Sequence, residues 1–416
     1  MRALRRHQPT PVTLAYAAFV LIGVRVGVSG VVLPAQIRDY GVDKATVGIT
    51  FLTASAGFVL GSLTAGALIH RFGTRIALVV GGGAYVVAGL YMATRPPFLA
   101  LVIVQVVVGY GTGVLESALN AYLTTLPRAT TLLNRLHAFF GVGALLGPLL
   151  AAWILGFASW TTVWLVLAVV GAPLVAAFLV AYPRPEADAS APRAVAKASE
   201  RARGGLLTAA LRERGVLLGA ALLAVYVGLE ISIGNWGFSY LVEERGQGDL
   251  LAGYTISGYW LGLTLGRFLI SPAATRIGLT VVGLIFACLA GVTAVATLTW
   301  LLPLAAATSV GFVLLGFVLG PIFPTTMAVA PKMTVTRLVP TAIGVMNAGS
   351  VVGGSALPWL AGAIAQGSGV WTLLPFAVTL ALLQMAVWWR MVECMRTARP
   401  DLDLECPSGP RPGELF

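Results

Sequence analysis

Four charged residues lie within long apolar stretches of this 416-residue chain: Arg25, Glu116, Glu230 and Arg267. An ionisable side chain at the centre of a membrane helix costs at least ~2.5 kcal/mol. Residues that are kept at such a cost commonly form ion or proton pathways, or sites for polar ligands. The chemistry that these four residues predict is therefore the binding of a proton or a polar solute.

Glu116 is the clearest candidate, because it is the only charge between residues 98 and 122. Asn120 lies one turn after it, and Gly109 and Gly113 precede it at helical spacing, so all four share one face of a helix. Burial favours a neutral carboxyl and a nearby cation favours a charged one, so a mobile arginine could load and unload a proton. The alternative is a permanently protonated or paired packing residue.

Two pairings are open for Arg25. Arg25 and Glu230 fall near the middle of their apolar stretches and are 205 residues apart, the shift of an internal repeat. Opposite charges at equivalent sites of facing halves can pair across a central cavity in one state and separate in another. Arg25 can instead pair with Glu116 within the first half. Arg267 follows a stripe of glycines and lies nine residues before Arg276, which indicates a structural or gating role.

The elements that position these residues are membrane helices. Hydrophobic residues make up 58% of the chain and charged residues 10%, whereas a soluble domain has roughly 25% charged residues. A helix that crosses the bilayer needs about 20 apolar residues. We predict twelve such spans: 12–36, 46–69, 76–94, 98–123, 136–158, 160–181, 215–241, 250–275, 279–301, 303–330, 340–364 and 370–390.

The basic residues predict the orientation of the chain. The net charge is +11, and 21 of the 27 Lys and Arg residues fall in segments on one side of the predicted spans, together with both termini. Cytoplasmic loops carry such an excess of positive charge. We therefore expect a multi-pass protein of the bacterial inner (plasma) membrane with both termini in the cytoplasm. Its partner is the lipid bilayer, and we expect no nucleic acid.

The spans divide into two groups of six. Residues 183–213 are rich in Pro, Ala and Arg and are predicted to be a cytoplasmic linker. It separates an N-terminal half (1–182) from a C-terminal half (214–393), which a cytoplasmic tail (394–416) follows. Gly57, Gly61, Arg71 and Gly73 recur 205 residues later as Gly262, Gly266, Arg276 and Gly278. Parallel six-helix repeats with a site at their interface are an architecture of secondary transporters.

The ten residues from Gly66 to Arg75 read Gly-Ala-Leu-Ile-His-Arg-Phe-Gly-Thr-Arg and follow the second predicted span. They resemble the loop signature of the major facilitator superfamily, which implies an all-α membrane fold of twelve helices in two pseudo-symmetric halves. The family has an acid where this chain has His70, and that acid anchors a charge network at the cytoplasmic gate. The residues assigned to the gate are Gly66, His70, Arg71, Gly73, Arg75, Arg267 and Arg276.

A narrower resemblance covers Glu116-Ser-Ala-Leu-Asn-Ala-Tyr122 and the segment from Leu133 to Phe140. Both are similar to the fourth and fifth helices of fucose-permease-like proton symporters. The resemblance implies that Glu116 takes part in proton coupling. Arg25 and Glu230 are further candidates for that role because of their charges and their repeat-equivalent positions. Fucose permease has an acid where this chain has Gly30, and its fifth-helix Gln and Asn are His137 and Phe140 here, which argues against fucose itself.

Aromatic and amide side chains in the predicted spans are candidates for solute contacts. Trp236 and Tyr240 share a helical face, and Trp260 shares one with Ser and Thr hydroxyls. An aromatic plate beside such donors suits a sugar-like solute, and ordinary packing explains either Trp nearly as well. The full set of candidates is Asn120, Asn134, His137, Trp236, Tyr240, Trp260 and Asn347.

The leading interpretation is a transporter that imports a small polar, sugar-like solute by proton symport. A proton-antiport exporter of drugs or metabolites is the alternative, and Phe140 and Gly30 would help to form the apolar cavity that it needs. A membrane enzyme or receptor is a third class, but the sequence contains no His-Glu-x-x-His motif, nucleophile elbow or phosphate loop. We expect no cofactor and no metal, because the three cysteines lack metal-ligand spacing, and we expect a monomer.

Overall fold

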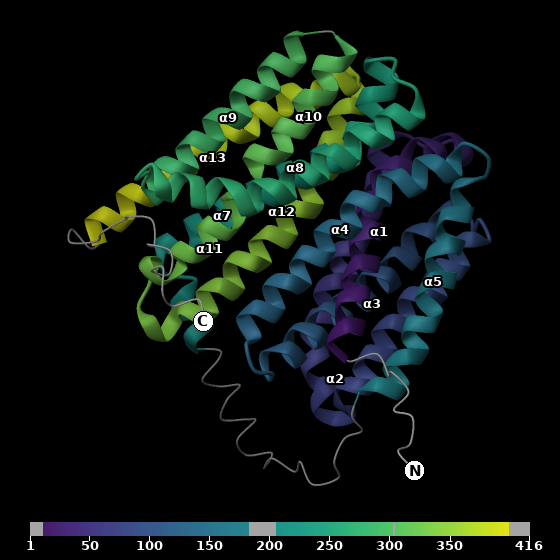
Figure 1. Ribbon diagram of the computed structural model, residues 1–416, viewed down its shortest axis with the longest axis horizontal. Coiled ribbons are helices and arrows are strands. Elements are labelled where there is room, and N and C mark those ends of the chain that lie inside the picture. The colour runs from purple at the N-terminus through teal and green to yellow at the C-terminus, as the bar shows by residue number, and fades with distance from the viewer. Residues whose placement is uncertain (1–10, 183–204, 303, 399–416) are drawn as a thin grey trace, which may run out of the picture. The chain divides into compact units, whose positions relative to one another are not determined.

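The computed structural model describes residues 11–182, 205–302 and 304–398, which form an all-helical structure (Figure 1). The first helices are α1 (Pro11–Tyr40), α2 (Lys44–Ala93), α3 (Phe98–Thr124), α4 (Ala129–Leu155) and α5 (Trp160–Ala181). Next come α7 (Arg214–Ser239), a π-helical turn (Tyr240–Glu244), α8 (Asp249–Arg276) and α9 (Val281–Leu301). The last are α10 (Ala305–Leu319), α11 (Ile322–Met333), α12 (Val339–Ser368) and α13 (Leu373–Ala398).

All twelve predicted spans fall on helices. In the described residues, ten helical segments are long and apolar enough to cross a membrane. One of them is α2, whose 50 residues extend about 75 Å at ~1.5 Å per residue, more than twice the ~30 Å hydrocarbon core. It therefore comprises two spans, and it bends at Gly73, where φ is +80° and ψ is 162°. The twelfth span is α8, which has 28 residues but is less apolar because of its Gly, Tyr, Ser and Thr residues.

The predicted span 303–330 corresponds to one apolar helical segment, Ala305–Met333. Within it, α10 ends at Leu319 and α11 begins at Ile322. Gly320 and Pro321 lie between them, and a proline lacks the N–H group that would continue the ladder of hydrogen bonds. Both residues keep right-handed helical backbone angles, so the span is interrupted only at this junction and is not unwound.

The structure divides into two compact units. Unit 1 contains residues 1–190 and 248–257, and unit 2 contains residues 191–247 and 258–416. In unit 1, α1 packs against α4, and α2 packs against α3 and α5. In unit 2, α7 packs against α12 and α13, and α9 packs against α10 and α13. Residues 183–204 of the predicted linker and 399–416 of the predicted tail lie outside the described residues, so the predicted domain boundaries stay predictions.

Glycines bring pairs of helices into backbone contact in each unit. A Cβ atom on Gly57 of α2 would lie 2.0 Å from a backbone oxygen of α3, and one on Gly109 of α3 would lie 1.9 Å from α2. In unit 2, a Cβ atom on Gly262 of α8 would lie 2.2 Å from a backbone oxygen of α10, and one on Gly316 of α10 would lie 2.0 Å from a backbone oxygen of α8. Small residues permit this close approach of membrane helices. The glycines that recur in the sequence therefore make equivalent helix contacts in the two units.

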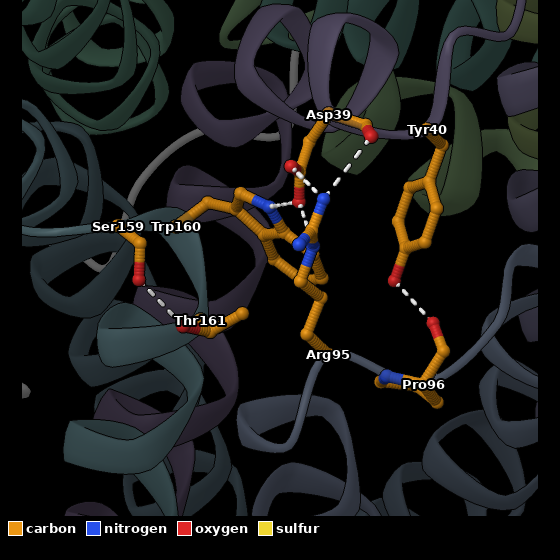
Figure 2. A network of polar contacts seen from close by, with 7 residues as sticks. All are labelled: Asp39, Tyr40, Arg95, Pro96, Ser159, Trp160 and Thr161. Atoms are coloured by element: carbon orange, nitrogen blue, oxygen red, sulfur yellow. Dashed lines mark hydrogen bonds and ion pairs between the residues drawn. The ribbon is translucent and has the colours of Figure 1, made fainter.

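Polar contacts tie together several helix ends of unit 1 (Figure 2). Asp39, near the end of α1, accepts hydrogen bonds from Arg95 Nε at 2.7 Å and from Trp160 Nε1 at 2.9 Å. The hydroxyl of Tyr40 donates to the carbonyl of Pro96 at 2.6 Å. These bonds join α1 to the connection between α2 and α3 and to the first turn of α5, so they fix the relative positions of these helix ends.

Candidate functional site

Glu116 lies in the second half of α3 and is partly buried. Its backbone carbonyl accepts a 2.8 Å hydrogen bond from Nδ2 of Asn120, which orients that amide along α3. Within the described part of the chain, the Glu116 carboxyl forms no hydrogen bond or ion pair. A carboxyl without a fixed partner is free to exchange a proton. Its role in proton coupling stays a prediction.

Arg25 lies on α1 next to the side chain of Tyr85 from α2. The Tyr85 hydroxyl is buried and has no hydrogen-bond partner among the described residues. The described part of unit 1 contains no ion pair between Arg25 and Glu116, so the pairing predicted within the first half is not formed in this conformation. The other predicted partner, Glu230, belongs to unit 2, and that pairing stays a prediction.

Glu230 forms an ion pair inside unit 2. Its Oε1 atom lies 3.5 Å from Nη2 of Arg267, and the two side chains are 9% and 30% exposed. The pair joins α7 to α8, and its two residues are 37 positions apart in the sequence. Helical periodicity relates residues three or four positions apart, so it gives no information about this contact. The sequence indicated a structural or gating role for Arg267, and it did not predict this contact.

Two tyrosines complete a buried cluster around this pair. Tyr226 lies one turn before Glu230, is adjacent to both charged groups, and donates a 3.1 Å hydrogen bond to the carbonyl of Leu319. The hydroxyl of Tyr259 donates to the backbone carbonyl of Glu230 at 3.0 Å. We call Tyr226, Glu230, Tyr259 and Arg267 the unit 2 polar cluster. Because Leu319 is the last residue of α10, the cluster lies beside the break between α10 and α11.

The predicted aromatic contacts for a solute are covered by protein. The exposed fractions of Trp236, Tyr240 and Trp260 are 2%, 0% and 2%. Nε1 of Trp236 donates to the carbonyl of Pro358 at 2.8 Å, and the Tyr240 hydroxyl accepts from Arg245 Nε at 2.8 Å. Trp260 packs against α7. In this conformation the three rings pack inside unit 2, and their predicted role in solute binding stays a prediction.

The predicted amide and imidazole contacts lie on exposed positions. Asn134 and His137 are on α4, and the His137 ring contacts the edge of Phe19 with 5.5 Å between ring centroids. Asn347 on α12 accepts a 3.4 Å hydrogen bond from the Ser350 hydroxyl. These side chains are accessible, which is consistent with a role in binding but does not test it.

The predicted gate residues gather at the bend of α2 and at the end of α8. Gly73 at the bend has a φ of +80°, and Gly278 after α8 has a φ of +67°; both backbone conformations favour glycine. Arg71 stacks its guanidinium over the Phe72 ring at 5.1 Å. The predicted gate residues at the bend are Gly66, His70, Arg71, Gly73 and Arg75, and the one at the end of α8 is Arg276. Their gating role stays a prediction.

Comparison with protein families identifies the fold. The family model described as Major Facilitator Superfamily matches residues 15–312, which is well over half of the chain. The chain belongs to the Major Facilitator Superfamily. The predicted fold class is therefore confirmed, and the chain is a multi-pass membrane transporter rather than an enzyme.

The proteins to which this chain is similar have names that describe different functions. "Bypass of stop codon protein 6" of Saccharomyces cerevisiae is 27% identical over 379 residues, which is 85% of this chain and 76% of the yeast protein. A "Glucose/galactose transporter" of Brucella abortus is 28% identical over 247 residues, 54% of this chain and 57% of that protein. The crystal structure of a point mutant of the nucleoside transporter NupG superposes on this chain with a TM-score of 0.74 at 12% sequence identity. The superposition covers 92% of this chain and 98% of the NupG chain. The narrower resemblance to fucose-permease-like symporters stays a prediction.

Proposed function

We propose that this superfamily member moves a small polar solute across the membrane in symport with protons. The observation that carries the proposal is the Glu116 carboxyl, which lies partly buried in a membrane span without a partner among the described residues. A buried carboxyl favours its protonated form, and access to water on either side lets it exchange that proton. A group with these properties can carry a proton from one side of the membrane to the other.

A sugar-like solute is the chemistry that the sequence favours, and the similarity to a glucose/galactose transporter agrees with it. The rings proposed to stack on a sugar are buried in this conformation, so Trp236 and Trp260 would have to become exposed when the solute enters. The proposed location is the inner membrane of a bacterium. The excess of basic residues on one side of the spans supports cytoplasmic termini.

Proton coupling at Glu116 is tested by comparing accumulation with exchange. A thermal-shift screen on the purified chain supplies a binding solute, which is then labelled and tested in proteoliposomes. We expect the natural chain to accumulate it under an imposed pH gradient. Glu116→Gln should lose accumulation and keep exchange at equal concentrations, because the amide binds no proton but preserves the shape of the side chain.

The matched control is Glu393→Gln, which changes an exposed carboxylate of α13 that pairs with Arg390. This variant should accumulate the solute like the natural chain. The proposal is contradicted if Glu116→Gln accumulates the solute as well as the control does. Proton-driven extrusion of the solute would instead support the antiport exporter.

A further inference from the structure

We infer that Arg267 binds a carboxylate of the transported solute, and that this carboxylate competes with Glu230 for the guanidinium. The inference rests on the proposed function and names the class of its solute as a small organic acid, such as a sugar acid, in place of a neutral sugar. It assigns Arg267 a role in solute recognition in addition to the gating role that the sequence predicts.

The first observation is that Arg267 is only partly used by its protein partner. Its contact with Glu230 is a single approach of 3.5 Å, and 30% of its side chain is exposed. Its Nε atom is buried and has no hydrogen-bond partner among the described residues. A guanidinium presents five donors in a planar fork that fits a carboxylate with two parallel hydrogen bonds. Tyr226 also contacts the guanidinium, and the donors that remain, Nε among them, are left for a second carboxylate.

The second observation is the helix break beside this cation. The Tyr226 hydroxyl holds the carbonyl of Leu319 at the end of α10, and its ring lies 6.1 Å from the ring of Phe323 in the first turn of α11. Tyr226 thus joins the charged pair on α7 and α8 to the junction between α10 and α11.

Competition for Arg267 couples solute binding to a proton. The groups that face Glu230 are Tyr226 from its own helix and Tyr259 and Arg267 from α8. Arg267 is the only cation that faces this carboxyl among the described residues of unit 2. When a solute carboxylate takes that cation, Glu230 is left as a buried anion without a counter-charge, which is strongly unfavourable. It therefore takes one proton from water, and it returns that proton when the solute leaves and the ion pair forms again.

The charge of the cluster does not change in this cycle. One carboxylate enters and one proton is bound, so the cluster contributes one proton for each solute anion, in addition to the proton that Glu116 carries. This gives Glu230 a role in recognition, and Glu116 remains the separate proton carrier of the proposed function.

The test is a thermal-shift titration of the purified full chain with matched carboxylates and neutral amides: benzoate and benzamide, lactate and lactamide, and gluconate and gluconamide. We expect at least one acid to raise Tm while its neutral counterpart does not, with tighter binding at pH 5.5 than at pH 8. Arg267→Gln should weaken binding of that acid by roughly 10- to 100-fold, the loss of one charge-assisted interaction.

Glu230→Gln distinguishes competition for Arg267 from an ion pair that only stabilises the fold. Because the amide does not compete for Arg267, this variant should bind the acid at least as tightly as the natural chain, with no dependence on pH. Arg390→Gln, which changes an exposed cation of α13, should bind it like the natural chain. If Arg267→Gln does not fold, the variant that carries Glu230→Gln as well removes both charges and should fold but not bind the acid.

The inference is overturned if no acid of the panel raises Tm, if Arg267→Gln binds the acid like the natural chain, or if Glu230→Gln keeps the pH dependence. Each of these results leaves the proposed function to its own test, since Glu116→Gln reports on accumulation of any solute, charged or neutral. Loss of accumulation in Glu116→Gln together with binding of neutral solutes alone would refute the inference and support the proposed function.

Discussion

The contact between α2 and α3 should not tolerate a single added methyl group. A Cβ atom on Gly57 would lie 2.0 Å from the oxygen of Val106 and 2.9 Å from the nitrogen of Tyr110, both backbone atoms. Because real Cβ atoms essentially never approach a neighbour closer than 3.0 Å, Gly57→Ala must separate the two helices locally by about 1.0 Å. Overpacking costs about 1–3 kcal/mol, and we expect the upper value because backbone cannot rotate away as a side chain can.

Gly83→Ala is the matched control on the same helix, since a Cβ atom there meets nothing within 4 Å. Alanine is favoured over glycine inside a helix by about 1 kcal/mol, so this variant should be neutral or slightly more stable. The free energy of unfolding is measured by SDS titration in mixed micelles, with helix content followed by circular dichroism. Equal unfolding midpoints for the two variants would refute the packing of α2 on α3 described above.

Three further predictions concern other parts of the structure. Trp160→Phe should lower the free energy of unfolding by about 1 kcal/mol through loss of its indole hydrogen bond, and Ser159→Ala, which removes only an exposed contact between the Ser159 and Thr161 hydroxyls, should lower it by less in the same SDS titration. The pKa of Asp43 is lowered because its carboxylate accepts a hydrogen bond from a first-turn N–H of α2. Its stabilisation of that turn should be present above the pKa of the unfolded state and be lost as the pH falls through the lower folded pKa, and hydrogen exchange of the first turn would detect this. Cys288, 5% exposed on α9, should resist a maleimide in the folded state, whereas the partly exposed Cys394 should react, as mass spectrometry of the labelled chain would show.

The sequence predicts the helices and their glycine contacts well, because both depend on local composition. Long apolar runs place all twelve spans, and the recurrence of Gly57 as Gly262 anticipates equivalent close contacts between helices in the two units. The junction between α10 and α11 inside the span 303–330 was not predicted, because a hydropathy pattern counts apolar residues and does not register the missing N–H group of Pro321.

The polar contacts are harder to predict, because they depend on tertiary structure. The pair between Glu230 and Arg267 joins neighbouring helices whose rotation about their axes decides which side chains meet. The same rotation buries Trp236 and directs its N–H to a backbone carbonyl. Tyr226 was missed as a member of the cluster, although its position one turn before Glu230 is a signal that a search for polar neighbours at helical spacing would have found.

The central claim, coupling of solute movement to protons, is tested most directly by the proton movement that the solute itself drives. Proteoliposomes that contain the purified chain and a pH-sensitive dye receive an inward gradient of the solute found by the thermal-shift screen, with no imposed pH gradient. Symport predicts that the lumen becomes acidic in either orientation of the protein, faster than in protein-free liposomes, and that Glu116→Gln reduces this change. An unchanged lumen pH, or a lumen that becomes alkaline, would contradict the account.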